Sequence, residues 1–234
     1  GKALEYMAMA GWKTKQMIGG LPGIMNLAAA SGEDLGSVSD IVTDALTAFR
    51  MNAEDAGRFA DVLAQASSNA NTNVGMMGAT FQKVAPVAGA LGYSVEDMSL
   101  AIGLMANASI KADVAGTSLK TSLANMAKPT KQMKAYMDRY GISLTRSDGT
   151  MKTFREVVDN LRGSLGGLSE AEQVAAATAI FGKESFAGML AVVNASDEDY
   201  KKLSDSINNA KGAAERMAAI KLDNLEGDIT LMKS

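Results

Sequence analysis

Carboxylates are the side chains in this sequence that could do acid–base or metal chemistry, because the chain has 0 His and 0 Cys. Histidine bases, histidine metal ligands and thiolate nucleophiles are therefore excluded. Many of the carboxylates stand three residues after a Ser, Asn or similar polar residue, a spacing typical of helix N-caps, and the helix dipole favours negative charge there. We interpret them as helix starts and not as catalytic pairs or metal ligands. The five segments are Ser31–Asp34, Ser37–Asp40, Asn52–Asp55, Ser94–Asp97 and Ser196–Asp199.

Glu184, which Ser185 follows, could support a different reaction, the cleavage of a glycosidic bond. That chemistry needs Glu184 as a general acid that stays protonated in an apolar sugar cleft. The pair resembles the Glu-Ser pair of lytic transglycosylases, but their downstream Gly-Leu-Met-Gln-like loop and a run of aromatics for stacking sugars are missing. The structural alternative is that Phe181 packs, Gly182 ends one helix and Ser185 helps to begin the next. We favour this alternative and predict no catalytic residue.

No segment predicts a cofactor or metal site. The loop Asn69–Gly75 superficially resembles a calcium loop, but its side chains are neutral amides, its Gly stands at the seventh place and Thr80 replaces the closing Glu. We expect a helix connection in which Asn73 caps the next helix. Trp12, the single Trp, is expected to pack against helices and not to bind a ligand.

The composition predicts a folded helical chain. Of 234 residues, 47% are apolar and only 5% aromatic, with 16 Met and 3 Pro, so the core must be built from Ala, Leu, Val, Ile and Met. A net charge of −3 does not favour nucleic-acid binding. No apolar run approaches the ~20 residues that span a bilayer, and no signal segment is recognisable. Because the chain opens on Gly1 and stops at Ser234 inside a helical pattern, we expect a piece of a longer polypeptide.

Apolar residues recur with helical period along nearly the whole chain. We expect Gly19-Gly20 to end the first helix and Pro22 to begin the second. Pro86 should kink or interrupt its helix, and a further helix should run from Pro129 to Gly141. The other predicted helices cover residues 3–18, 22–30, 38–49, 53–68, 74–90, 95–108, 114–127, 153–165, 169–181, 185–194, 197–209 and 213–232.

These segments predict an all-α fold, a multi-helix bundle of about ten to twelve short helices and helical hairpins. At most one small β-hairpin is expected, near 142–152, where Asp148-Gly149 is a hairpin turn pair. We expect one helical subdomain over 1–130, a second over 131–212, and over 213–234 the start of a long helix leaving the domain. The apolar residues expected on a loose stripe of that helix are Met217, Ile220, Leu225, Ile229 and Met232.

The stretch Val84–Met126 is expected to organise the chain as a helical hairpin. Ser94 is a natural N-cap, and Asp97 could return a bond to its amide. Gly92 is expected to supply the preceding corner in the left-handed conformation. Two helical stripes follow, and we expect both to be core. Their central residues are Ile102, Met105, Leu119 and Leu123.

The same stretch carries a family resemblance. Its sequence VAPVAGALGYSVEDMSLAIGLMANASIKADVAGTSLKTSL resembles the core region of phage tail tape measure proteins of the TP901 family, in which a "vapvA..lG.s.ee" segment leads to "aGikg..AGt.L". The resemblance continues upstream through LPGIMNLAAASGEDL and downstream through AIFGKESFAGMLAVV, so it covers nearly the whole chain in order. One departure is that the usual Gly-Ile-Lys-Gly is Ser-Ile-Lys-Ala here (Ser109–Ala112), which predicts a less tight turn before Val114.

The resemblance implies a structural component of a phage or prophage tail, a tape measure segment that helps to set tail length, templates the tube and leaves during DNA ejection. Implied partners are further copies of the chain, the tail tube protein, tail assembly chaperones and tail tip or baseplate proteins. Implied locations are the virion tail and, during assembly, the bacterial cytoplasm; no enzymatic activity is implied. The alternatives are a helical secreted toxin or pore-former, whose best membrane segment Leu100–Ala108 is too short, and a peptidoglycan-cleaving lytic transglycosylase segment.

Overall fold

The computed structural model describes residues 1–233, and within that range no strand forms. The all-α prediction is confirmed, because the described residues form thirteen α-helices and one short 3-10 helix. The predicted hairpin near 142–152 is reduced to one antiparallel bridge, between Thr145 and Met151. The elements are α1 (Lys2–Met9), α2 (Thr14–Ser31), α3 (Leu35–Ala48), η1 (Ala53–Asp55), α4 (Ala56–Asn69), α5 (Val74–Ala90), α6 (Val95–Asn107), α7 (Ala112–Ala127), α8 (Lys131–Tyr140), α9 (Phe154–Leu165), α10 (Glu170–Phe181), α11 (Phe186–Asn194), α12 (Asp197–Asn208) and α13 (Ala213–Lys233).

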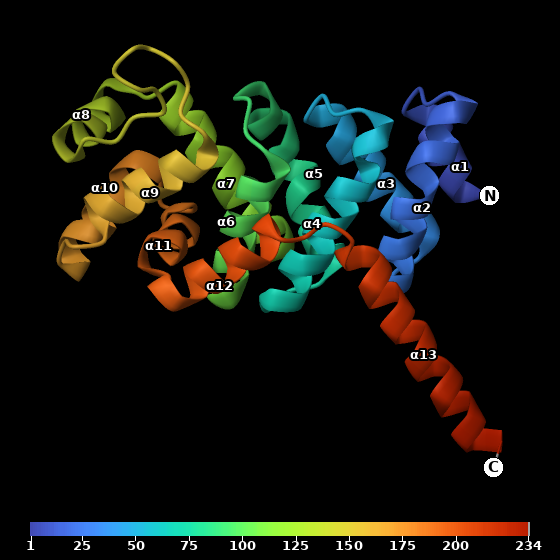
Figure 1. The fold of residues 1–234 in the computed structure, drawn as a ribbon. Helices are drawn as coiled ribbons and strands as arrows, with labels where there is room; N and C mark the ends of the chain where they lie inside the picture. Colours follow the sequence, from blue (N-terminus) through green and yellow to red (C-terminus); the bar gives the residue numbers. More distant parts are fainter. Residues whose placement is uncertain (234) are drawn as a thin grey trace.

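The helices are arranged in a row (Figure 1). α1, α2 and α3 lie at one end, α4 to α7 in the middle and α8 to α11 at the other end. α12 then runs back along the row and packs against α6 and α4, and the first turns of α13 pack against α2 and α4. The rest of α13 projects away from the other helices (Figure 1). Contacts of α7 with α10 and α11 cross the subdomain boundary proposed at residue 130, and that division stays a prediction.

The helices of the row pack through a small cluster of aromatic rings and through close backbone approach at glycine. Phe81 stands between Phe59 and Phe49, with edge-to-face ring contacts at 5.3 and 5.9 Å. A Cβ on Gly89 would lie 2.1 Å from the carbonyl oxygen of Ala48, so α5 can approach the end of α3 only with glycine there. The interior therefore combines a few aromatic rings with helices in near backbone contact, as the low aromatic content predicts.

Residues 14–31 form one continuous helix, so the predicted break at Gly19-Gly20 is wrong. The turn between α1 and α2 lies earlier in the chain, at Gly11, whose φ is +82°. Gly20 serves packing instead, since a Cβ there would lie 2.4 Å from the ring of Trp12, which confirms Trp12 as a packing residue. Pro22 stays inside α2 because the packing of α2 on α4 and α13 outweighs the one amide hydrogen bond that proline cannot donate.

Pro86, which was predicted to kink or interrupt its helix, lies inside one continuous helix, α5, so the helix is not interrupted there. At Pro129 the helix begins slightly later than expected, because Thr130 is the N-cap of α8 and accepts a hydrogen bond from the amide of Met133. Gly141, with a φ of +66°, ends α8 as predicted.

Most of the predicted capping residues begin helices. Asn73, Ser94 and Ser196 each accept a hydrogen bond from the backbone amide three residues further on. Asp97 accepts from the amide of Arg155 on α9 instead of from the Ser94 amide, so it joins two helices. The caps of Asn73, Ser94 and Ser196 are therefore local features that sequence spacing predicts well.

The start of α3 was predicted wrongly at both candidate segments. Asp34, and not Ser31, caps this helix by accepting from the amide of Ser37. Ser31 is still the last residue of α2, where its hydroxyl donates to the carbonyl of Ala28 and accepts from the amide of Glu33, so its bonds lie before the first turn of α3. Ser37 consequently lies inside α3, which begins at Leu35.

The two helices of the Val84–Met126 stretch are core, as predicted. The central residues of the two stripes are at most 2% exposed; they are Ile102, Met105, Leu119 and Leu123. Gly92 has a φ of +76°, which confirms the left-handed corner before Ser94. At the departure from the family pattern, Ser109 and Ala112 also have positive φ, +66° and +51°. The turn therefore keeps a backbone that glycine adopts more easily than Ser or Ala.

Candidate interaction surfaces

Glu184 lies exposed in the turn between α10 and α11, not in a sugar cleft. Its neighbours have structural positions: Phe181 is fully buried, and Gly182 has a φ of +93° and follows the last residue of α10. Ser185 is buried, and its carbonyl accepts a hydrogen bond of 2.8 Å from the Ser118 hydroxyl. The segment therefore fastens the corner of α10 and α11 to α7.

The predicted helix-start carboxylates make structural contacts. Glu96 on α6 forms a two-pronged ion pair with Arg58 on α4, and although burial alone would raise it, the net pKa of Glu96 is lowered by this hydrogen-bonded guanidinium. Asp97 lies 3.3 Å from the Arg155 guanidinium. Asp55 accepts from the amide of Asn52. Among residues 1–233, no three acidic side chains are grouped so that they could hold a metal ion.

The loop that superficially resembles a calcium site connects two helices. The amide of Asn71 donates to the side-chain carbonyl of Asn107 at 2.9 Å, and Asn73 caps α5. The first bond ties the loop to the end of α6 and the second begins α5, so both have structural roles.

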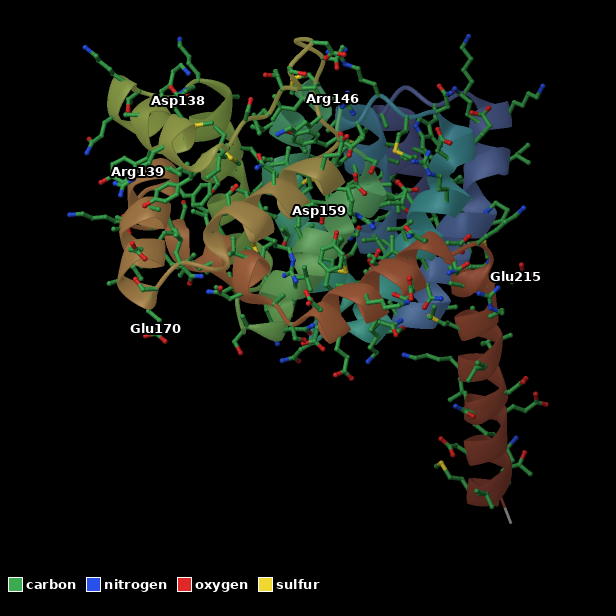
Figure 2. The ribbon with its side chains drawn as sticks, turned by 60° about the vertical axis from the view of Figure 1, so that its left-hand side comes forward. Asp138, Arg139, Arg146, Asp159, Glu170 and Glu215 are labelled. Atoms are coloured by element: carbon green, nitrogen blue, oxygen red, sulfur yellow. The ribbon has the colours of Figure 1, made fainter. Side chains whose placement is uncertain are left out.

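Charged side chains of both signs are spread over the surface (Figure 2). On α8, Lys134 pairs with Asp138, and in the loop before α9 Arg146 pairs with Glu156 at 2.6 Å. Asp159 on α9 accepts a hydrogen bond from the Tyr200 hydroxyl on α12. The Lys134–Asp138 pair therefore partly neutralises the positive charge carried by α8.

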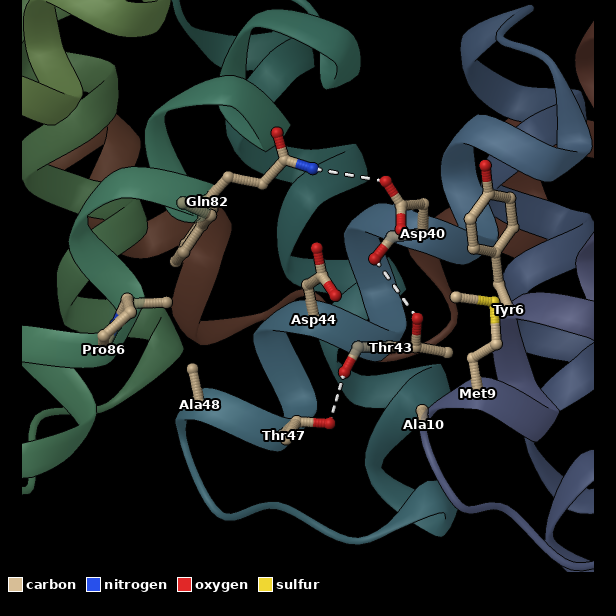
Figure 3. Close-up of a pocket in the computed structure, with 12 residues that line it drawn as sticks. Tyr6, Met9, Ala10, Asp40, Thr43, Asp44, Thr47, Ala48, Gln82 and Pro86 are labelled. Carbon is tan, nitrogen blue, oxygen red and sulfur yellow. Dashed lines mark hydrogen bonds between the residues drawn. The ribbon is translucent and has the colours of Figure 1, made fainter.

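A groove of about 670 Å³ runs along α3 between α1 and α5 (Figure 3). Tyr6 and Met9 form one wall and Pro86 part of the other, with Asp40 and Asp44 on the α3 side. The Gln82 amide donates to Asp40 at 3.4 Å. Asp44 is exposed at the edge of the groove, and partial desolvation there, followed by the nearby Asp40 carboxylate, raises its pKa. The groove could therefore hold an apolar group that carries a positive charge.

A second surface lies on the projecting part of α13. Leu222, Leu225, Ile229 and Met232 follow one another at spacings of three, four and three residues, and their exposed fractions are 59%, 56%, 42% and 87%. We call these four residues the α13 seam. The stripe predicted from the sequence lacked Leu222 and contained Ile220, which lies on nearly the opposite side of the helix. The heptad spacing was the signal that could have found Leu222.

Asp61 on α4 fixes the start of α13, and sequence reasoning missed it. Its carboxylate accepts hydrogen bonds from the amides of Gly212 and Ala214, at 2.8 and 3.0 Å. These are amides at a helix start that have no partner within the helix. Asp61 thus acts as an N-cap from another helix and ties the start of α13 to α4. No local sequence signal could reveal it, because 151 residues separate Asp61 from Gly212.

These features define an all-helical structural module with an exposed apolar stripe on α13 and a groove beside α3. Among the described residues, no helix is both long enough and apolar enough to cross a membrane. The chain belongs to the family of phage-related minor tail proteins, whose sequence pattern matches residues 1–182.

Two tape measure proteins are similar to the chain. It is 36% identical over 231 residues to the tape measure protein of Pneumococcus phage Dp-1, and the aligned region covers 99% of this chain and 20% of the phage protein. It is 23% identical over 231 residues to a probable tape measure protein of Escherichia phage P2, and this aligned region covers 97% of this chain and 28% of that protein. The chain therefore spans 20% of one relative and 28% of the other. No solved structure matches it.

The resemblance inferred from the sequence is thus confirmed, and the chain is a structural part of a phage tail. Neither the toxin nor the transglycosylase alternative is favoured by these relatives. The prediction that the chain has no catalytic, cofactor or metal-binding residue stays a prediction.

Proposed function

We propose that the chain is one folded segment of a tape measure protein that sets the length of a phage tail and templates assembly of its tube. The observation that carries this proposal is the collinear similarity to two tape measure proteins over nearly the whole chain. The projection of α13 supports it, because a compact body that continues into an exposed helix suits a protein that is extended elsewhere.

In this proposal several copies associate, assemble with the tube protein, chaperones and tip proteins in the host cytoplasm, and leave the tail during DNA ejection. The segment has no enzymatic role, and its surface binds protein and not a specific nucleic-acid sequence. The net charge of −3 supports this, since a mildly acidic surface does not retain passing DNA.

Tail length tests the proposal. A continuous helix advances ~1.5 Å per residue, so removing roughly 100 residues from the extended helical part of the parent protein should shorten the tail by about 150 Å in electron micrographs. Deleting Val84–Met126 should instead abolish assembly or infection, because it removes the core helices α6 and α7. Tails of unchanged length after the first deletion would contradict the ruler function. Normal infectious tails after the second would show that this segment is dispensable.

A further inference from the structure

The groove beside α3 has apolar walls that are open to solvent. Met9 on α1 is 82% exposed and Pro86 on α5 is also exposed, although both border the groove. α1 and α5 each pack against α3, and the groove follows α3 between them from Asp40 to Ala48 (Figure 3). Two turns of helix are about 12 Å long. A hollow of this length suits a short helical segment of another protein that lays its apolar face into it.

The groove offers more hydrogen-bond acceptors than free donors. Asp40 and Asp44 stand one turn apart on α3 and border it (Figure 3). Pro86 has no amide hydrogen to donate to the carbonyl of Gln82 four residues earlier, so that carbonyl lacks its usual partner in α5. The side-chain amide of Gln82 already donates to Asp40. A guanidinium group, which carries five N–H donors and a positive charge, matches this set of acceptors.

Asp40 and Asp44 have no cation beside them in their own chain. Among residues 1–233, neither carboxylate forms an ion pair, and no Lys or Arg borders the groove. Like charges four residues apart destabilise a helix, and the pKa of Asp44 is raised by partial desolvation and by Asp40. The pair therefore destabilises the free protein, and a bound cation would relieve the repulsion. Destabilising groups of this kind are typical of sites that serve a function.

We propose that the groove binds a helical segment of a partner protein through two basic side chains one turn apart, which pair with Asp40 and Asp44. The apolar side chains beside them pack on Tyr6, Met9 and Pro86. Arginine suits the site better than lysine, because its planar guanidinium bonds to a carboxylate and a backbone carbonyl together while its stem packs on the apolar walls. The contact is reversible, since partly exposed ion pairs are individually weak.

A synthetic peptide tests the contact with the whole chain. The probe is a blocked alanine-rich peptide of about 16 residues, long enough to form a helix, with two arginines one turn apart and leucines beside them. With isotope-labelled methionine methyl groups, the nuclear magnetic resonance signal of Met9 should shift as peptide is added, while that of Met232 on the α13 seam stays unchanged. The same peptide with citrulline for arginine keeps the shape without the charge and should bind about 10-fold more weakly. A shift of Met232 and not of Met9 would place the peptide on α13 and overturn the proposal.

Substitutions test the role of the two carboxylates. Asp40→Asn combined with Asp44→Asn should weaken binding of the arginine peptide by about 10-fold and leave the protein folded, because the change removes repulsion within α3. Asp223→Asn combined with Asp228→Asn removes the same charge from exposed sites on α13 and should leave the affinity unchanged. Equal affinity of the two double variants for the peptide would refute the pairing.

Charge exchange tests whether the pairing is direct. Asp40→Lys combined with Asp44→Lys should abolish binding of the arginine peptide and create binding of a peptide with glutamates at the same positions. A variant that binds neither peptide would contradict direct pairing. If the wild-type chain alone self-associates in sedimentation and the asparagine pair makes it monomeric, a second copy occupies the groove and the proposal is wrong. The tail-length experiment reports on the ruler function separately, so failure of one proposal can be distinguished from failure of the other.

Discussion

Replacing Asp61 with alanine should release the first turn of α13. The carboxylate accepts two backbone hydrogen bonds, from Gly212 and Ala214. Hydrogen bonds to a charged acceptor contribute about 1.5–3 kcal/mol when well placed, and removing a capping side chain costs about 0.5–2 kcal/mol. Asp61 is only half-buried, so we expect a loss of about 1–2 kcal/mol. That loss raises the equilibrium constant for opening this turn by a factor of about 5–30.

Hydrogen exchange of the backbone amides measures this opening directly. In Asp61→Ala, exchange at Gly212 and Ala214 should accelerate by about that factor, while amides in the core of α6 keep their wild-type rates. Asp61→Asn keeps one acceptor oxygen and should give an intermediate effect. Asp223→Asn, an exposed change on α13 itself, is the matched control and should leave these rates unchanged. Wild-type exchange at Gly212 and Ala214 in the alanine variant would show that packing alone fixes α13, and would refute the role assigned to Asp61.

Three further outcomes are expected. Ile102→Asp places an unpaired charge at a site 2% exposed and should lower the free energy of unfolding by more than about 3 kcal/mol, whereas Val114→Asp, at an exposed site, should change it little in the same urea titration. Ser109→Gly and Ala112→Gly remove the strain of a left-handed backbone and should each raise the free energy of unfolding by about 0.5–1 kcal/mol. A lower free energy of unfolding would mean that the positive φ carries no strain. The raised pKa of Asp44 means that the folded protein binds this proton more readily than the unfolded chain, so the ionised carboxylate destabilises the fold at neutral pH. Asp44→Asn should therefore raise the melting temperature at about pH 7 and lose that advantage at about pH 3, where the carboxyl group is protonated in both states. An equal change in melting temperature at both pH values would contradict the assignment.

Local signals predicted the helices well, because a helix start depends on few neighbouring residues. Ser94 and Asn73 cap as their spacing predicts. The break predicted at Gly19-Gly20 failed because glycine has two uses that sequence alone does not separate. Gly11 ends a helix through its positive φ, whereas Gly20 stays helical and admits the ring of Trp12.

Long-range contacts could not be predicted from the residues alone. Asp61 has no sequence feature that separates it from other surface carboxylates, and its partners lie 151 residues away. The groove beside α3 is likewise formed by three helices whose mutual packing no local pattern fixes. The α13 seam, by contrast, was within reach, since its heptad spacing is a property of one short segment and needs no knowledge of the rest of the fold.

The position of the seam bears on how such a chain could measure length. A compact body of about 210 residues has a radius of gyration of about 17 Å, whereas the same number of residues in one helix would extend for about 300 Å. Residues before Ala213 therefore contribute little to a length, and each residue of α13 contributes ~1.5 Å. A ruler needs its extended part to keep a fixed direction relative to its folded part. In the proposed ruler, the Asp61 hydrogen bonds and the packing of α13 on α2 and α4 would hold that direction, at the point where the body gives way to the projecting helix.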